Sequence, residues 1–317
     1  MMRRLSLITP SGRLTLGNLL GALQPMADAA GPDAFYGLSD LHALTTPHQP
    51  DVLRARTQEM AMLLLAAGLS PATLFRQSAV PDHRSLAYLL ECVGMTGELS
   101  RMIQFKEKSR RPGASVRTSL FTYPILMAAD ILLYGAAEVP VGDDQRQHVE
   151  LARDLALRFN TTYGLVFTVP RAVHPAAGAR VMDLADPTRK MSKSAGDAHP
   201  GSIFLLDPPD VVRRKVSRAV TDSDSSVRRD REHKPGVTNL IDILEACGGS
   251  VSGVTLYGSL KSAVTDAVVA VLAPLQKRYA ELAADPAYVT SVYAEGAERC
   301  REVTAPVLAA AEAAIGL

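Results

Sequence analysis

Apolar and polar residues follow two recurring patterns in the first part of the chain. Short apolar runs that are rich in β-branched or aromatic side chains occupy residues 4–8, 33–40 and 72–78, and this pattern predicts strands. The segment 51–68 has the pattern of a helix, follows a proline and ends at a glycine. Strands that alternate with helices predict βαβ units and a parallel sheet.

Helical patterns become more frequent further along the chain. Two helical segments, at about 82–108 and 118–134, are expected to form an insertion that covers the sheet. A helix at 145–159 and a strand at 179–184 then lead into a loop at 185–201, which is rich in Gly, Pro, Ser and Lys. Beyond this loop the strand patterns fade.

The chain is therefore expected to divide near Gly201. A sheet domain would cover residues 1–200, with the helical insertion at about 82–134, and a helical domain would cover 201–290. A C-terminal helix over 291–317 is expected to pack back on the first domain. The helices of the last third are expected at residues 209–220, 238–247, 259–283 and 286–317.

Composition sets the class of protein but excludes few functions. The 317 residues are 47% hydrophobic and 21% charged, which is typical of a globular protein. Lys and Arg number 34 against 33 Asp and Glu, so the net charge does not indicate a polyanionic partner. The three cysteines lack metal-binding spacing, and no run approaches the roughly 18 apolar residues of a membrane span. We expect a soluble cytoplasmic protein.

The first candidate for chemistry is the bend "PSGRLTLGN" at residues 10–18. Gly12 and Gly17 allow a ligand to approach the backbone, and Asn18 can cap the helix that follows. The N-terminus of a helix suits phosphate. An ordinary strand-to-helix turn explains this stretch equally well, and neither GxGxxG nor GK[ST] occurs.

The second candidate is "KMSKS" at residues 190–194. Two lysines three residues apart lie in a loop bordered by Pro187, Gly196 and Pro200. Lysines on such a loop can close on a charged group and leave again, although solvated surface is the commoner explanation of a charge run.

Together, "TLGN" and "KMSKS" resemble the two signatures of class I aminoacyl-tRNA synthetases. Thr15 and Asn18 replace the two histidines of the usual HIGH motif, and this variant after "PSG" is similar to the tryptophanyl-tRNA synthetase family. Five further stretches resemble that family in the same order: "DLHALT" at 40–45, "GELSRMIQFKEKS" at 97–109, "TYPILMAADILLY" at 122–134, "VPVGDDQRQHVELARDLALRFN" at 139–160 and "AVTDS" at 219–223.

This resemblance implies a Rossmann-type, doubly wound parallel sheet and a C-terminal all-helical domain. It implies activation of L-tryptophan by ATP with Mg²⁺, release of pyrophosphate and transfer to tRNA(Trp) by a homodimer. Magnesium would be carried by ATP rather than by the protein. The nearest alternative is a tyrosine enzyme of the same architecture, and a second is a synthetase-like binding or regulatory protein without aminoacylation.

The resemblance also implies residues for the nucleotide. Lys190 and Lys193 are the candidate cations for pyrophosphate, and Thr15 and Asn18 would hold phosphate oxygens. Lys108 resembles a third phosphate lysine, although a solvated helix lysine fits the sequence too. The expected ATP-binding residues are Thr9, Pro10, Ser11, Gly17, Asn18, Gly142, Asp143, Asp144, Val181, Lys190, Met191, Ser192, Lys193 and Ser194.

Asp130 is the candidate selector of the amino acid. It lies in an apolar segment, where a buried carboxylate needs a partner, and an indole N–H is such a partner. The polar face of an amphipathic helix is the alternative location. Tyr123 and Met127 share its helical face, a spacing that is also typical of a core. The expected tryptophan-binding residues are Asp130, Tyr123, Met127, Gln145, His42, Val139, Val141, Leu5 and Leu7.

The first strand departs from the family pattern "FSGIQPSG". Leu5, Leu7 and Thr9 stand where family members commonly have Phe, Gly and Gln, which suggests an auxiliary or inhibitor-tolerant paralogue. The basic segments at 105–117, 212–218 and 227–234 suit tRNA phosphates, although helix surfaces carry such runs without nucleic acid.

Overall fold

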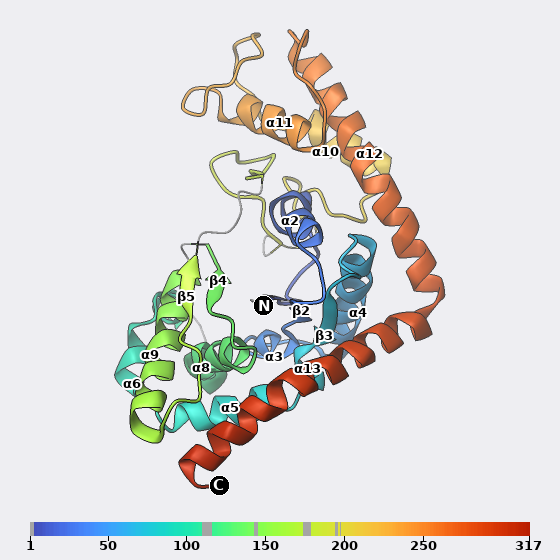
Figure 1. Cartoon of the computed structure of the whole chain (residues 1–317). Helices are drawn as coiled ribbons and strands as arrows, with labels where there is room; N and C mark the ends of the chain where they lie inside the picture. Colours follow the sequence, from blue (N-terminus) through green and yellow to red (C-terminus); the bar gives the residue numbers. More distant parts are fainter. Residues whose placement is uncertain (1–2, 110–115, 143–144, 174–178, 194–195, 197) are drawn as a thin grey trace.

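The computed structural model describes residues 3–109, 116–142, 145–173, 179–193, 196 and 198–317 (Figure 1). Three parallel strands, β1 (Arg4–Ile8), β2 (Ala34–Leu38) and β3 (Thr73–Arg76), form a sheet in that order. A second parallel pair consists of β4 (Glu138–Pro140) and β5 (Arg171–Val173), and β4 contacts β1. The spatial order β3–β2–β1–β4–β5 changes its winding direction between β1 and β4. In sheets of this kind the ligand crevice lies at that point, beyond the carboxyl ends of the strands.

Helices connect and cover these strands. After β1 the chain forms one continuous helical stretch from three pieces, α1 (Leu16–Asn18), the π-helical η1 (Leu19–Leu23) and α2 (Gln24–Asp28). The other helices are α3 (Asp40–Ala43), α4 (Pro50–Ala66), η2 (Gln77–Ala79), α5 (Asp82–Glu91), α6 (Thr96–Arg101), α7 (Ile103–Ser109), α8 (Thr118–Leu133), α9 (Arg146–Tyr163), α10 (Pro209–Ser217), α11 (Pro235–Ala246), α12 (Tyr257–Ala284) and α13 (Pro286–Ile315).

Two apolar cores cover the two faces of the sheet, because successive residues of a strand point to opposite faces. Leu5, Phe35 and Phe75 belong to a core that they share with α5, α8, α9 and α13. Tyr36 and Leu74 belong to a second core, which includes α4, α11 and α12. Each large apolar side chain buried in this way contributes about 1.5–3 kcal/mol. The class is therefore the α/β, Rossmann-type doubly wound fold that the sequence predicts.

The last two helices connect the helical region to the sheet. In Figure 1, α12 descends from beside α10 and α11 to α4, and α13 then crosses β3 and α5. Gly296 allows α13 to pack closely on β3, since a Cβ at this position would lie 1.8 Å from the carbonyl oxygen of Leu74. The hydroxyl of Tyr293 also donates to the carbonyl oxygen of Ala61 at 3.1 Å. By length and composition α12 could cross a membrane, and 33% of its apolar window is buried, on a face that includes Leu260, Val264 and Val268 and that packs in the core with α4 and α11.

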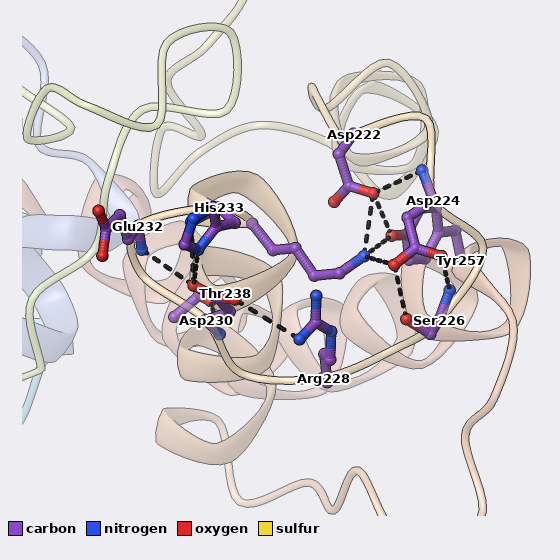
Figure 2. Close-up of polar contacts among 10 residues, drawn as sticks. Asp222, Asp224, Ser226, Arg228, Asp230, Glu232, His233, Thr238 and Tyr257 are labelled. Atoms are coloured by element: carbon purple, nitrogen blue, oxygen red, sulfur yellow. Dashed lines mark hydrogen bonds and ion pairs between the residues drawn. The ribbon is translucent and has the colours of Figure 1, made fainter.

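A polar centre organises the start of the helical region (Figure 2). Lys234 is 2% exposed, and its Nζ donates to Asp222 Oδ1 at 3.0 Å and pairs with Asp224 Oδ2 at 2.7 Å. The hydroxyl of Tyr257 donates to the same Asp222 oxygen at 2.6 Å. Hydrogen bonds hold the pKa of Asp222 below its usual value despite the opposing effect of desolvation. These contacts fix the 220–234 segment between α10 and α11 to the start of α12.

The secondary structure differs from the sequence prediction at three places. The single helical segment predicted over 82–108 is three helices, because Met95 and Met102 have extended ψ values of 130° and 127°. The strand predicted over 179–184 is absent from its described residues, where Met182 makes one isolated antiparallel bridge to Lys190. Asn239 instead holds the backbone of Met182 through hydrogen bonds of 2.8 and 2.9 Å. Strand β5 was not predicted.

Candidate active site

The bend after β1 is built around a reciprocal cap. The backbone N–H and the hydroxyl of Thr15 both donate to Asn18 Oδ1 at 3.0 Å, and the backbone N–H of Asn18 returns a bond of 3.4 Å to Thr15 Oγ1. Thr15 is fully buried. Its side chain therefore positions Asn18 rather than facing solvent. Since the oxygen of the Asn18 amide is used, the Nδ2 donors are the part of this side chain that can bind a phosphate oxygen.

The lysine loop lies directly on this bend. A Cβ at Gly12 would be 2.5 Å from the carbonyl oxygen of Lys193, and one at Gly17 would be 3.4 Å from that of Met191. Met191 and Val181 are buried in the same core, and the N–H of Met191 donates to the carbonyl oxygen of Val181 at 3.1 Å. The two motifs are more than 170 residues apart in sequence but are in contact in space.

Lys193 closes the contact with its side chain. Its Nζ donates to the carbonyl oxygen of Thr9 at 2.7 Å, and burial lowers the pKa of this ammonium to about 8. The Thr9 hydroxyl is 2.9 Å from the hydroxyl of Ser39, which precedes α3. Lys190 is exposed. One lysine of the loop is therefore held at the bend, while the other faces solvent.

A cleft of about 400 Å³ opens beside the bend. Its lining includes Pro10 and Ser11 from the bend, His48 and Arg56 from the start of α4 and the segment before it, and Arg117 from the start of α8. The two guanidinium groups give this cleft a positive charge, which suits phosphate or carboxylate groups.

Asp130 is buried on α8, with 1% of its surface exposed. Its Oδ1 accepts from Gln77 Nε2 and contacts His83 Nδ1, each at 2.7 Å, and its Oδ2 contacts His42 Nε2 at 2.9 Å. Burial would raise the pKa of Asp130, but hydrogen bonds and charge interactions with His42 and His83 outweigh it and hold the pKa at about 2. Asp130 is therefore an ionised carboxylate with protein donors on both oxygens.

Other predicted residues of the tryptophan pocket contact His42 or belong to the core that includes α8. The His42 ring meets the ring of Tyr123 edge-on, with 6.2 Å between centroids, and the Tyr123 hydroxyl is 2.8 Å from His148 Nε2. Burial raises the pKa of Tyr123 to about 12. The other predicted pocket residues in this core are Leu5, Leu7, Met127, Val139 and Val141.

Leu7 has a specific space in this core. It pairs with Gly37 across the β1–β2 register. A Cβ at Gly37 would lie 2.8 Å from Leu7 Cδ2 and 2.7 Å from Phe75 Cζ. The leucine side chain and the glycine on the next strand are therefore complementary in shape.

The remaining predicted residues lie after β4, in the lysine loop or in α7. The backbone N–H of Gln145 donates to the carbonyl oxygen of Gly142 at 3.0 Å, beyond the carboxyl end of β4. Ser192 is exposed. Asp143, Asp144 and Ser194 lie outside the described residues, as does the side chain of Lys108, whose backbone belongs to α7.

Sequence analysis missed two of the three side chains that hold Asp130, those of Gln77 and His83. Gln77 directly follows β3, and a polar residue at the carboxyl end of a parallel strand is a signal that could have identified it. His83 lies near the start of α5 and contacts Tyr134. The sequence contains no comparable signal for His83 or Tyr134.

The chain is similar to known proteins over its whole length. The family model of class I tRNA synthetases (W and Y) matches residues 2–272. Tryptophan–tRNA ligase 1 of Streptomyces avermitilis is 53% identical, and the match covers 100% of this chain and 99% of that protein. The tryptophanyl-tRNA synthetase structure of Mycoplasma pneumoniae is 36% identical with a TM-score of 0.86, covering 100% and 98% of the two chains. That of Campylobacter jejuni in complex with ADP and tryptophan is 30% identical with a TM-score of 0.87 and covers both chains fully.

Proposed function

Because the chain belongs to the family of class I tRNA synthetases for tryptophan and tyrosine, we propose that it joins L-tryptophan to tRNA(Trp). Its 53% identity with a tryptophan–tRNA ligase across the full length supports tryptophan as the amino acid. The chain is thus an aminoacyl-tRNA synthetase that consumes ATP and forms AMP and pyrophosphate. The structural observation that supports this function best is the contact between the bend after β1 and the lysine loop.

The reaction has two steps. In the first, a carboxylate oxygen of tryptophan attacks the α-phosphorus of ATP, the bond to the bridging oxygen breaks, and pyrophosphate leaves with its electron pair. In the second, a ribose hydroxyl of the tRNA terminus attacks the carbonyl carbon of the adenylate, and AMP leaves. Neither step needs a protein nucleophile, so positioning and charge neutralisation supply the catalysis.

The bend and the lysine loop are proposed to hold the triphosphate. Lys193 would leave the carbonyl oxygen of Thr9 and bind phosphate oxygens as charge builds up on pyrophosphate. Asn18 would donate through Nδ2, Thr15 would keep that amide in place, and Lys190 would add a second cation from the exposed part of the loop. Lys193 is the residue with the larger predicted effect on rate because it is already at the bend.

Magnesium is proposed to arrive on the phosphates of ATP. The described side chains at the bend are hydroxyl, amide and ammonium groups, which suit phosphate oxygens better than a divalent cation. Bound in this way, Mg²⁺ would neutralise part of the triphosphate charge.

Asp130 is proposed to select the amino acid. Its ionised carboxylate would accept the indole N–H, a hydrogen bond that phenylalanine cannot donate. Tyr123 and Met127 would contact the indole ring, and Gln145 the ammonium group. A tyrosine enzyme would instead need partners for a phenol hydroxyl.

The assembly and the tRNA side are also proposals. We place the catalytic domain at residues 1–200, the tRNA side at 201–290 and a bracing helix at 291–317, and we propose a cytoplasmic homodimer. The basic segments at 105–117, 212–218 and 227–234 would face tRNA phosphates, apart from Lys215 and Lys234, whose ammonium groups pair with carboxylates of the chain. Leu7 supports a narrower proposal of an inhibitor-tolerant paralogue, because its side chain belongs to the core around the tryptophan site.

Exchange of labelled pyrophosphate into ATP tests the first step directly. We expect exchange with tryptophan and much less with tyrosine or phenylalanine at equal concentration. Charging of tRNA(Trp) then tests the second step. Exchange supported best by tyrosine would favour the tyrosine alternative, and exchange without charging would favour a regulatory synthetase-like protein.

A further inference from the structure

We propose that His83 is a positioning residue for amino acid selection: with Gln77 it fixes Asp130 so that only Oδ2 of the carboxylate is presented to the indole. This inference rests on the proposed role of Asp130. It assigns a role to two residues that lie outside the motifs and that the reaction itself does not use.

The two oxygens of Asp130 have different surroundings. Oδ1 forms hydrogen bonds with Gln77 and His83, whose side chains are both fully buried. The partner that the structure shows for Oδ2 is His42, whose side chain is 14% exposed. We infer that an indole reaches Oδ2 by displacing or joining the His42 ring, because both partners of Oδ1 are fully buried.

The contact with Asp130 places a proton on one ring nitrogen of His83. Asp130 is ionised and can only accept, so His83 Nδ1 carries the proton of their bond. The other ring nitrogen, Nε2, is 3.1 Å from the hydroxyl of Tyr134, and that hydroxyl also interacts with the thiol of Cys300 on α13. Burial is the main cause that raises the pKa of Tyr134 and of Cys300, the latter to about 12, so both groups keep their protons. Tyr134 and Cys300 of α13 therefore lie at the ring nitrogen of His83 that does not contact Asp130.

Two donors on one oxygen restrict rotation of the carboxylate. If Asp130 turned about its terminal torsion, the bonds from Gln77 and His83 would both break inside a core where no water replaces them. The ring of His83 is itself held by stacking on Phe75, with 5.9 Å between centroids. A carboxylate held in this way meets the indole N–H without further ordering, which is the condition for selection by a hydrogen bond.

A pair of variants at position 83 separates positioning from packing. Asn places its Nδ2 donor near the position of the histidine Nδ1, and Leu has the same branching without a donor. We expect His83→Leu to raise the KM for tryptophan by about 10- to 100-fold, the range for a lost hydrogen bond to a charged group, with the KM for ATP nearly unchanged. His83→Asn should restore most of the tryptophan affinity.

The dependence on pH gives a second readout. The titratable groups that face Asp130 are His42 and His83, with Tyr134 behind His83. In His83→Leu, burial acts on a carboxylate with fewer donors, so its pKa should rise. As pH is lowered, the KM for tryptophan should therefore begin to increase at a higher pH in the leucine variant than in the asparagine variant.

The outcomes separate this inference from the proposed function. Tryptophan-dependent exchange by the unaltered chain, with the leucine variant impaired and the asparagine variant restored, supports both. Equal behaviour of the two variants, in KM and in pH profile, overturns the positioning role and leaves the function intact. If His83→Leu does not fold, Tyr134→Phe replaces it, with a higher KM for tryptophan expected and an unchanged KM overturning the role. An unaltered chain that does not activate tryptophan overturns both.

Discussion

The contact between Gly12 and Lys193 gives the sharpest prediction, because it joins the backbones of the two nucleotide motifs. A Cβ added at Gly12 would lie 2.5 Å from the carbonyl oxygen of Lys193. Favourable contacts between such atoms begin at about 3.5 Å, so one segment must move by about 1 Å. Gly12 does not have a positive φ, so the effect of Gly12→Ala comes from this contact alone.

We expect Gly12→Ala to slow adenylate formation by about 100-fold, because a 1 Å misplacement of positioning groups has an effect of that order. Tryptophan binding without ATP should be nearly unchanged, since Asp130 lies on α8, whose apolar residues belong to the other core. The chain contains no tryptophan, so indole fluorescence reports the bound amino acid without background from protein tryptophan. Single-turnover consumption of ATP gives the rate, and fluorescence titration gives the affinity.

Gly31→Ala is the matched control, because a Cβ at Gly31 would have no neighbour within 4 Å. It should keep the rate and the affinity of the unaltered chain. A wild-type rate in Gly12→Ala would show that the backbone contact is not needed for the chemistry. Equal losses of rate and of tryptophan affinity would show general damage instead.

Three further predictions concern α13, Lys193 and the polar centre. Gly296→Ala should lower the free energy of unfolding by about 3 kcal/mol, because its Cβ would meet the carbonyl oxygen of Leu74 at 1.8 Å. Gly258→Ala is the control, because its Cβ would have no neighbour within 4 Å, and it should leave the free energy of unfolding unchanged. Thermal unfolding measures both variants. Burial lowers the pKa of Lys193 to about 8, so the cation is lost as pH rises through that value, and kcat/KM for ATP should fall above about pH 8. Lys193→Arg should reduce this fall at alkaline pH. An equal fall in both proteins would exclude Lys193 as its source. Lys234→Met should lower the melting temperature, because it leaves two carboxylates without their buried cation, and an unchanged transition would contradict that role.

The fold was predictable where a local pattern and the observed structure depend on the same residues. The strands at 4–8 and 73–76 combine apolar and β-branched or aromatic side chains, and both were located within two residues. β5 has only three residues, so its position depends on pairing with β4 rather than on its own pattern. The segment 179–184 has the composition of a strand, but Asn239 occupies the backbone groups that a ladder would use.

The candidate site was only partly predictable for a similar reason. The bend and the lysine loop are contiguous motifs, so their residues could be named from sequence, although their contact could not. Two of the three partners of Asp130, Gln77 and His83, lie 53 and 47 positions earlier in the chain, and neither belongs to a motif. Contacts of this kind depend on how α5 and α8 pack together.

The central claim is that the bend after β1 and the lysine loop act together on the triphosphate. Single-turnover adenylate formation by Lys193→Ala, compared with tryptophan affinity from indole fluorescence, tests it most directly. We expect a large loss of rate with nearly unchanged affinity, because the lysine contact strengthens as charge moves onto pyrophosphate. A rate equal to that of the unaltered chain would contradict the account.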